Sequence, residues 1–173
     1  DCGLATFHVT VNDTTPPVVT GTADRAATGA GWYNGNVTIT WSSADPAPSS
    51  GAPNVPAPTV VSAEGANQLI TSAPSCDGAH NCATGSLLIS IDKTAPGGII
   101  TSTGLILVGP VLGQTETGTA SDALSGVGSV RVNYTSKVLG VGSKSVFGIV
   151  TCNAGNHTCT WTAALPTVPG LYS

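Results

Sequence analysis

The sequence predicts an all-β fold made of two consecutive antiparallel β-sandwiches, and three observations support this prediction. First, a phrase is repeated: residues 13–17 (Asp-Thr-Thr-Pro-Pro) and 92–96 (Asp-Lys-Thr-Ala-Pro) begin 79 positions apart, the length of a small sandwich domain. Second, short runs of alternating apolar and polar residues recur along the chain. Third, the 173 residues include 22 Gly, 12 Pro and no Met, and they are poor in the residues that favour helices.

The alternating runs mark the expected strands in chain order. The clearest are residues 7–11, 37–41, 87–91, 130–134 and 159–163. In the second run Val37, Ile39 and Trp41 share one face and two threonines occupy the other, a pattern typical of a half-buried antiparallel strand. Clusters of Gly, Asn, Asp and Pro separate the runs, and seven-strand sandwiches fit this spacing.

The repeated phrase marks the expected domain joints, because proline lacks the N–H group that a β-ladder needs. We expect residues 1–13 to be the terminal strand of a preceding or neighbouring domain, residues 14–94 the first sandwich and residues 95–173 the second. Residues 169–172 (Pro-Gly-Leu-Tyr) are similar to the corner that opens the penultimate strand of an immunoglobulin-type sandwich. The second sandwich is therefore expected to lack its last two strands, and either the continuation of a longer protein or another copy would complete its open edge.

The cysteines favour an extracellular or cell-surface protein. Cys76 and Cys82 bracket one turn-forming stretch, and Cys152 and Cys159 bracket another. Each pair predicts a disulfide; zinc is the alternative because each loop contains a histidine, although neither loop has the Cys-x2-Cys spacing that zinc sites favour. Two disulfides would leave Cys2 unpaired within this chain and would fit an oxidising compartment.

Charge and hydropathy exclude two classes of partner. Only 8% of the residues are charged, the formal net charge is −4, and the five Lys and Arg residues are scattered singly. Nucleic acid is therefore not expected as a partner, because no basic patch is available to neutralise phosphates. The longest apolar run, residues 105–112, is interrupted by Gly109 and is too short to predict a membrane span.

Several short motifs together resemble a known family. They are Asp-Thr-Thr-Pro-Pro (13–17), Gly-Trp-Tyr-Asn-Gly-Asn-Val-Thr (31–38), Asp45 followed by Ser50-Gly51, Glu64-Gly65, and Ile-Asp-Lys-Thr-Ala-Pro (91–96). This set resembles the bacterial extracellular immunoglobulin-like repeats of large surface and secreted proteins, over most of residues 13–96. The second half carries a thinner match, in residues 117–122 and 125–127, and residues 1–13 are similar to the final strand of a hyalin-type repeat.

The resemblance implies tandem immunoglobulin-like sandwiches that serve as a non-catalytic structural module of an extracellular fibre, filament or cell-surface stalk. Neighbouring copies or domains of the same protein would then be the partners, through strand complementation. The alternative is a carbohydrate- or surface-binding accessory module, in which Trp32 and Tyr33 would stack on sugar. Burial of Trp32 and Trp161 separates the two, and we expect Trp41 and Trp161 to lie inside their sandwiches.

Candidate residues for chemistry are few. The histidines His8, His80 and His157 lack partners at ligand or triad spacing, and no nucleophile or phosphate-loop motif is present, so no enzyme is predicted. Calcium is the one cofactor considered, because carboxylates occur at expected strand ends or joints, where hard oxygen ligands could converge. These are Asp13, Asp45, Asp77, Asp92 and Asp122, and the alternative is that each caps a turn.

Two covalent modifications are also considered. Lys93, Lys137 and Lys144 are candidates for a Lys–Asn isopeptide crosslink of the kind known in bacterial adhesin sandwiches. The sequence shows no recognisable set of a lysine, an asparagine and an acidic residue in apolar surroundings. Asn12, Asn36, Asn133 and Asn156 each begin an Asn-x-Thr sequence, which is the acceptor pattern for N-glycosylation.

Overall fold

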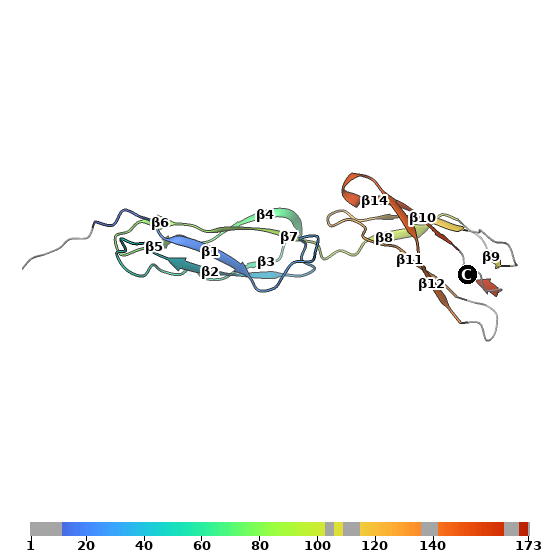
Figure 1. The fold of residues 1–173 in the computed structure, drawn as a ribbon, viewed down its shortest axis with the longest axis horizontal. Helices are drawn as coiled ribbons and strands as arrows, with labels where there is room; N and C mark the ends of the chain where they lie inside the picture. The colour runs from blue at the N-terminus through green and yellow to red at the C-terminus, as the bar shows by residue number, and fades with distance from the viewer. Residues whose placement is uncertain (1–11, 103–105, 109–114, 136–141, 165–169, 173) are drawn as a thin grey trace, which may run out of the picture. The chain divides into compact units, whose positions relative to one another are not determined.

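The computed structural model describes residues 12–102, 106–108, 115–135, 142–164 and 170–172, and these are arranged as short antiparallel strands (Figure 1). The chain divides into two compact units, Asp1–Lys93 and Thr94–Ser173, one residue away from the expected joint at 94–95. Among the described residues the one helical segment is a single 3-10 turn, η1 (Ala154–Asn156). The all-β prediction is therefore confirmed, whereas the strand expected at 7–11 lies outside the described residues.

The first unit is built from three antiparallel sheets. Its strands are β1 (Val18–Ala23), β2 (Val37–Ala44), β3 (Thr59–Val61), β4 (Gly65–Thr71), β5 (Ser75–Cys76), β6 (Cys82–Ala83) and β7 (Ser86–Ile91). The first three strands form a sheet in the order β1-β2-β3, while β4 pairs with β7 and β5 with β6. The loop before β2 also reaches β7, since Tyr33 N–H donates to the Ser90 carbonyl and Asp92 N–H donates to the Tyr33 carbonyl, both at 2.9 Å.

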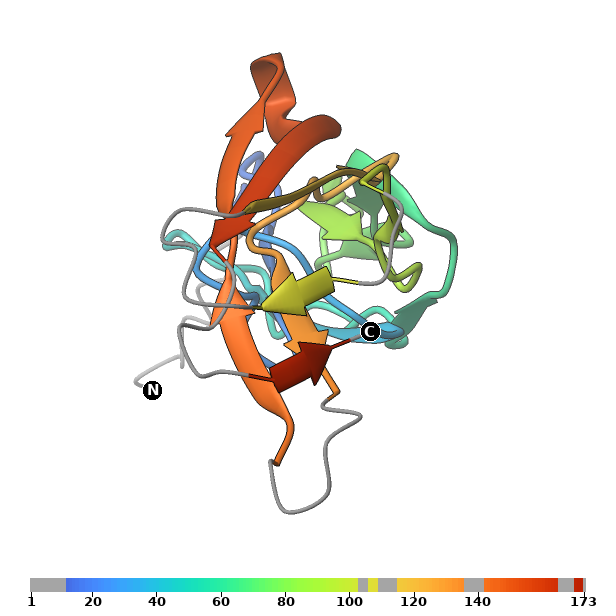
Figure 2. The same cartoon turned by 90° about the vertical axis from the view of Figure 1, so that its right-hand side faces the viewer.

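The second unit contains a four-stranded sheet and two strand pairs. Its strands are β8 (Gly97–Ile100), β9 (Ile106–Val108), β10 (Thr115–Ser121), β11 (Arg131–Tyr134), β12 (Lys144–Phe147), β13 (Ile149–Cys152), β14 (Thr158–Ala164) and β15 (Gly170–Tyr172). The large sheet has the order β13-β14-β10-β8, and β11 pairs with β12. The strand β15, where the penultimate strand was expected to open, pairs with β9 (Figure 2).

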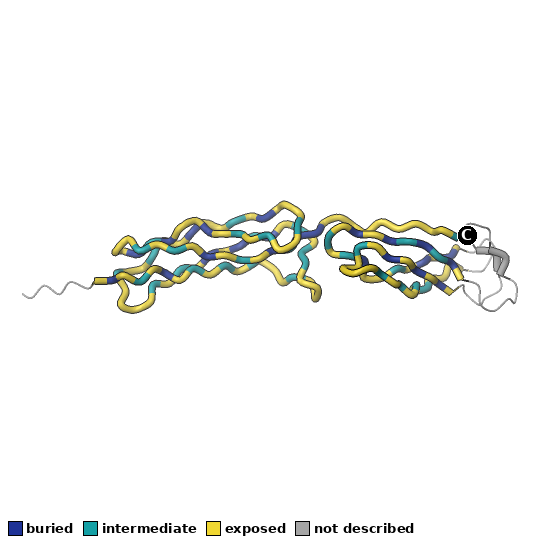
Figure 3. The backbone as a smooth tube through the Cα atoms, turned by 90° about the horizontal axis from the view of Figure 1, so that it is seen from above, coloured by how far each residue is buried: buried dark blue, intermediate teal, exposed yellow. Residues whose placement is uncertain are grey.

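Burial alternates along the core strands, as the sequence pattern predicts (Figure 3). In the first unit Val37, Ile39 and Trp41 of β2 pack with Val61, Ile89 and Ile91. In the second unit Trp161 and Cys159 of β14 pack with Val132 and Tyr134 of β11, so the core lies between the large sheet and the β11-β12 pair. Trp41 is 2% exposed and Trp161 is 4% exposed, which confirms that both lie inside their units.

Each core tryptophan lies opposite a glycine on the neighbouring strand. Gly21 of β1 pairs with Trp41, and Gly118 of β10 pairs with Trp161. A Cβ atom at Gly21 would lie 2.5 Å from the Trp41 ring, and one at Gly118 would lie 2.2 Å from the Trp161 ring. Both glycines belong to a Thr-Gly-Thr-Ala sequence, at 20–23 and 117–120, so the two units use the same short sequence to seat a tryptophan.

Candidate functional site

Both predicted disulfides are present, and each closes a β-hairpin. The sulfur atoms of Cys76 and Cys82 are 1.98 Å apart, and those of Cys152 and Cys159 are 2.03 Å apart. Within each pair the two cysteines face each other across an antiparallel strand pairing. Because these sulfurs are bonded to each other, they are not free thiolates for zinc, and the zinc alternative is not supported. Cys2 lies outside the described residues.

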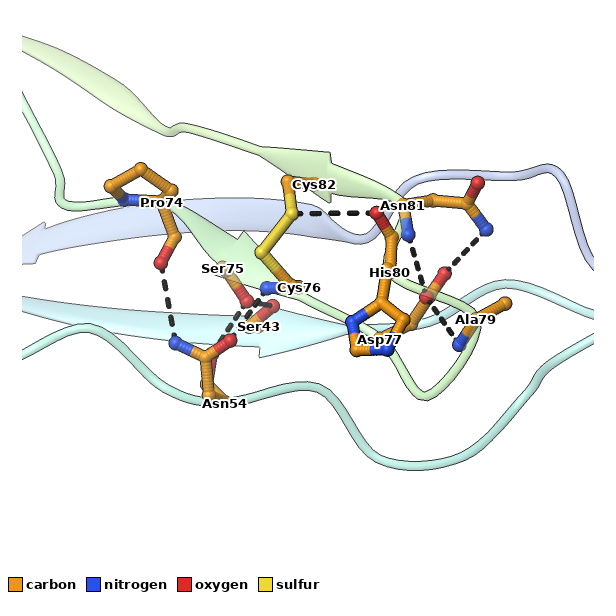
Figure 4. The surroundings of a disulfide bond; sticks show 10 residues. All are labelled: Ser43, Asn54, Pro74, Ser75, Cys76, Asp77, Ala79, His80, Asn81 and Cys82. Carbon is orange, nitrogen blue, oxygen red and sulfur yellow. Dashed lines mark hydrogen bonds between the residues drawn. A yellow bond between two sulfur atoms is a disulfide. The ribbon is translucent and has the colours of Figure 1, made fainter.

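The Cys76–Cys82 hairpin holds the proline-rich segment 46–58 through Asn54 (Figure 4) and through Ser50, whose hydroxyl accepts from Ala79 N–H at 2.9 Å. Asn54 Oδ1 accepts a hydrogen bond from Cys76 N–H at 2.6 Å, and Asn54 Nδ2 donates to the Pro74 carbonyl at 3.2 Å. The Asn54 carbonyl also accepts from the hydroxyl of buried Ser75, at 2.5 Å. A segment that has little regular structure is therefore fixed to the unit through backbone and hydroxyl groups of the crosslinked hairpin.

Three aspartates converge beside this hairpin. Asp13 precedes β1, Asp45 follows β2 and Asp77 follows β5, and one carboxylate oxygen from each lies within 4.8 Å of the others. Asp13 and Asp77 are buried, and Asp45 is half-buried. Carboxylate oxygens are hard ligands, which Ca²⁺ prefers. Of the described residues, this is the group whose geometry would suit such a cation.

Hydrogen bonds from turns hold the Asp77 carboxylate in place. Its Oδ1 accepts from the backbone N–H groups of Ala79 and Asn81, both at 2.9 Å, and its Oδ2 accepts from Asn81 Nδ2 at 2.9 Å. Burial alone would raise the pKa of the Asp77 carboxyl, but these hydrogen bonds outweigh burial and lower its pKa below the ordinary value of 3.8. The same Asn81 amide donates to the Asp13 carbonyl at 3.0 Å, which links two members of the cluster.

One backbone group joins the other two aspartates. Ser50 N–H donates to Asp13 Oδ2 at 2.9 Å and to Asp45 Oδ2 at 3.2 Å. Asp45 Oδ2 also accepts from the Ser49 hydroxyl at 2.8 Å, whereas Asp45 Oδ1 is buried and has no hydrogen-bond partner in the described part of the chain. All three carboxylates thus accept backbone N–H groups, as the turn-capping alternative predicts, and Asp45 Oδ1 is the oxygen that would distinguish a cation site from a capping network.

The other two aspartates in the calcium prediction do not join this cluster. Asp92 follows β7, and its backbone N–H donates to the Tyr33 carbonyl. Asp122 belongs to the second unit, where its Oδ1 accepts from Leu124 N–H at 3.0 Å and Gly126 N–H at 2.8 Å, so it caps a turn. Of the five aspartates in the calcium prediction, the structure brings together Asp13, Asp45 and Asp77 and does not bring Asp92 or Asp122 to them.

A lysine, an asparagine and a glutamate meet at the end of β7. Lys93 Nζ donates to Asn36 Oδ1 at 3.2 Å and to the Ser62 carbonyl at 2.6 Å, while the Lys93 N–H donates to Glu64. An amine needs desolvation or a base to become a nucleophile, and Lys93, Asn36 and Glu64 are all exposed. These contacts therefore favour a set of hydrogen bonds between Lys93, Asn36, Ser62 and Glu64 over an isopeptide crosslink. Lys137 lies outside the described residues, and Lys144 is exposed on β12.

The remaining candidates lie mostly at the surface. The asparagines of the four Asn-x-Thr sequences, Asn12, Asn36, Asn133 and Asn156, are all exposed. Trp32 is half-buried, and Tyr33 packs partly against the core while its backbone bonds to β7, so the two do not form an open aromatic platform. His80 is exposed, His157 Nδ1 lies 3.1 Å from the Asp122 carbonyl, and His8 is not among the described residues.

No protein-family model matches the chain, and neither a curated protein nor a solved structure is detectably similar to it. In the part of the chain that the structure describes, no helix has the length and apolar character needed to span a bilayer. What the protein does must therefore be inferred from its own residues.

Proposed function

We propose that the chain is a non-catalytic structural module of an extracellular fibre, filament or cell-surface stalk built from repeated immunoglobulin-like domains. The observation that carries this proposal is that two consecutive units each have a tryptophan-centred core and a disulfide-closed hairpin. A chain that repeats the same kind of unit along its length suits a spacer, because each unit has its own hydrophobic core.

The strand order supports an immunoglobulin-like arrangement. In immunoglobulin domains one sheet has the order A-B-E-D, and the other contains C, F and G. If β8, β10, β11, β13 and β14 are strands A to E, then the sheet β8-β10-β14-β13 has this A-B-E-D order and β11 belongs to the opposite sheet. In the first unit the sheet β1-β2-β3 likewise places the first strand at an end beside the second, although no described strand lies between β2 and β3 along the chain to take the places of C and D.

The disulfides favour an exposed, protease-rich environment. Exposed loop tips are the preferred sites of proteolytic cleavage, and both crosslinks close such tips. Each short loop also loses conformational entropy in the unfolded chain, and its closure stabilises the folded unit by about 2 kcal/mol. The chain thus relies on crosslinks and apolar cores, since its charged residues are few.

The carbohydrate-binding alternative has weaker support. Trp161 is buried in the core of the second unit and is not available to stack on sugar. Trp32 is half-buried, and Tyr33 is engaged with β7. A surface that binds polysaccharide generally presents aromatic faces to solvent, and the pair Trp32 and Tyr33 does not do so.

Two measurements on the full chain test the proposal. Under non-reducing conditions a broad-specificity protease should cleave the wild-type protein slowly, and a Cys76→Ser/Cys82→Ser variant should be cut faster between positions 76 and 82. The protein should also show no retention on insoluble polysaccharides. Retention that Trp32→Ala abolishes would overturn the structural proposal in favour of an accessory binding module.

A further inference from the structure

The first strand of the second unit, β8, has one edge that no described strand covers. Residues Gly97–Ile100 of β8 pair with β10, and the other edge of β8 has no strand partner among the described residues. All four residues of β8 are exposed, and the side chains of Ile99 and Ile100 are 63% and 56% exposed. An edge strand that exposes large apolar side chains is a template for pairing with another strand.

An apolar hollow lies beside this edge. Its volume is about 260 Å³, and its walls include Ile100 of β8, Val130 and Val132 from the β11 segment, and the core residue Trp161. A cavity of about 150 Å³ can accommodate a benzene ring. The hollow is therefore large enough for the phenyl ring of a phenylalanine, and it leads directly to the core of the second unit.

In the first unit the last strand lies close to the first strand, although it pairs with β4 and not with β1. There the last strand, β7, buries Ile89 and Ile91 in the core. It also approaches the first strand of the unit, because a Cβ atom on Gly85, the residue before β7, would lie 2.7 Å from the Val19 carbonyl oxygen of β1. The strands β1 and β8 are equivalent in their sheets, since each occupies an end and pairs with a strand that leads to an aspartate and a Ser-Gly turn. The hollow beside β8 is therefore where the apolar side chains of a strand like β7 would fit.

The chain carries a second sequence of this kind in residues 5–13. Phe7, Val9 and Val11 alternate with polar residues before Asp-Thr-Thr-Pro-Pro, as Leu87, Ile89 and Ile91 do before Asp-Lys-Thr-Ala-Pro. Asp13 at the end of the segment is fixed to the first unit through Ser50 and Asn81. The phrase at 92–96 connects a completed unit to the next one, and the phrase at 13–17 would do the same between two copies.

We propose that residues 5–12 of one copy add as a strand to the open edge of β8 in a second copy, with Phe7 in the apolar hollow. Backbone hydrogen bonds along β8 would supply affinity, and the fit of alternate side chains into the hollow would supply specificity. His8, Thr10 and Asn12 would then face solvent, consistent with their polar character. This inference rests on the proposed structural function, and it names the contact by which copies join.

Sedimentation velocity of the full chain over a range of concentrations tests the contact. The wild type should associate into chains of copies, and Phe7→Asp or Ile100→Asp should weaken association at least tenfold. His8→Asp is the matched control for the first variant, because it places the same charge on the opposite face of the strand. Ile149→Asp is the control for the second, because Ile149 is 76% exposed on β13, at the other end of the same sheet.

Mixing the two variants gives a sharper result. The Phe7→Asp protein retains an intact hollow and the Ile100→Asp protein retains an intact strand, so an equimolar mixture should form dimers but no longer species. A wild type that remains monomeric at high concentration, or controls that weaken association as much as the test variants, would overturn the inference. A monomer that still resists protease and binds no polysaccharide would leave the proposed function intact, so the two failures are distinguishable.

Discussion

The two units share a local motif but differ in how their first strands are covered. Both place a glycine of a Thr-Gly-Thr-Ala sequence opposite a buried tryptophan, at Gly21–Trp41 and Gly118–Trp161. In the first unit β7 fills the core and Ile91 is fully buried. In the second unit Ile99 and Ile100 of the first strand, β8, are largely exposed, and Ile100 lines an apolar hollow. The comparison teaches that the glycine–tryptophan contact forms from neighbouring strands, whereas the core of the first unit also needs the side chains of β7, its last strand.

The largest effect should come from removing the two tryptophans. Truncation of a buried tryptophan to alanine costs about 3–5 kcal/mol, so Trp41→Ala and Trp161→Ala should each strongly destabilise their own unit. Trp161→Ala should have the smaller effect, because its core adjoins an open hollow that can rearrange. Urea unfolding monitored separately for each unit would measure both values. Half-buried Trp32→Ala is the control, and equal losses for all three would contradict the assignment of the cores.

The glycines opposite the tryptophans should give the next largest effect. A Cβ atom at Gly118 would lie 2.2 Å from both the Trp161 ring and the Ile99 carbonyl oxygen, whereas one at Gly21 would meet side chains alone. Overpacking of this kind costs about 1–3 kcal/mol, and Gly118→Ala should lie toward the upper end because a backbone atom must move. Gly29→Ala, which meets nothing within 4 Å, is the control. Thermal melts in which Gly29→Ala loses as much stability as Gly118→Ala would contradict this account.

Much of the fold could be predicted because its signals are local. Alternation with a period of two predicts β2, β7, β11 and β14, and each cysteine pair spans a single hairpin. The repeated Thr-Gly-Thr-Ala sequence is visible in the chain, but only the strand pairing shows that each of its glycines lies opposite a tryptophan. The sequence could not predict which of the five aspartates meet, because Asp13, Asp45 and Asp77 come together through contacts between distant segments. Spacing alone did not separate them from Asp92 and Asp122.

A pH effect should distinguish the units further. The lowered pKa of Asp77 means that the folded state stabilises the charged carboxylate. This charge therefore adds to the free energy of unfolding above the ordinary pKa of 3.8, and the addition is lost as the pH falls through the lower pKa of the folded state. The first unit should therefore lose stability below about pH 4, and Asp77→Asn should reduce this dependence. Asp24→Asn is the control: hydrogen bonding to Arg25 lowers the Asp24 pKa as well, but this ion pair is exposed and solvent weakens it. An Asp24→Asn effect as large as that of Asp77→Asn would contradict a role for the cluster.

Of these treatments, calcium should change the difference in stability between the two units least. Each carboxylate in the cluster already accepts backbone N–H groups, so capping of turns accounts for the convergence of Asp13, Asp45 and Asp77 without a cation. We expect millimolar calcium to leave the unfolding midpoint of the first unit within about 1 °C of its value in chelator, since one kcal/mol of stabilisation would shift it by several degrees. Asp45→Asn sharpens the test, because it replaces the carboxylate whose Oδ1 is buried without a partner among the described residues. The contrary result would be an unfolding midpoint that rises and saturates with calcium in the wild type but not in Asp45→Asn. It would show that the cluster is a cation site and that calcium stabilises the first unit. The described residues of the second unit contain no such cluster.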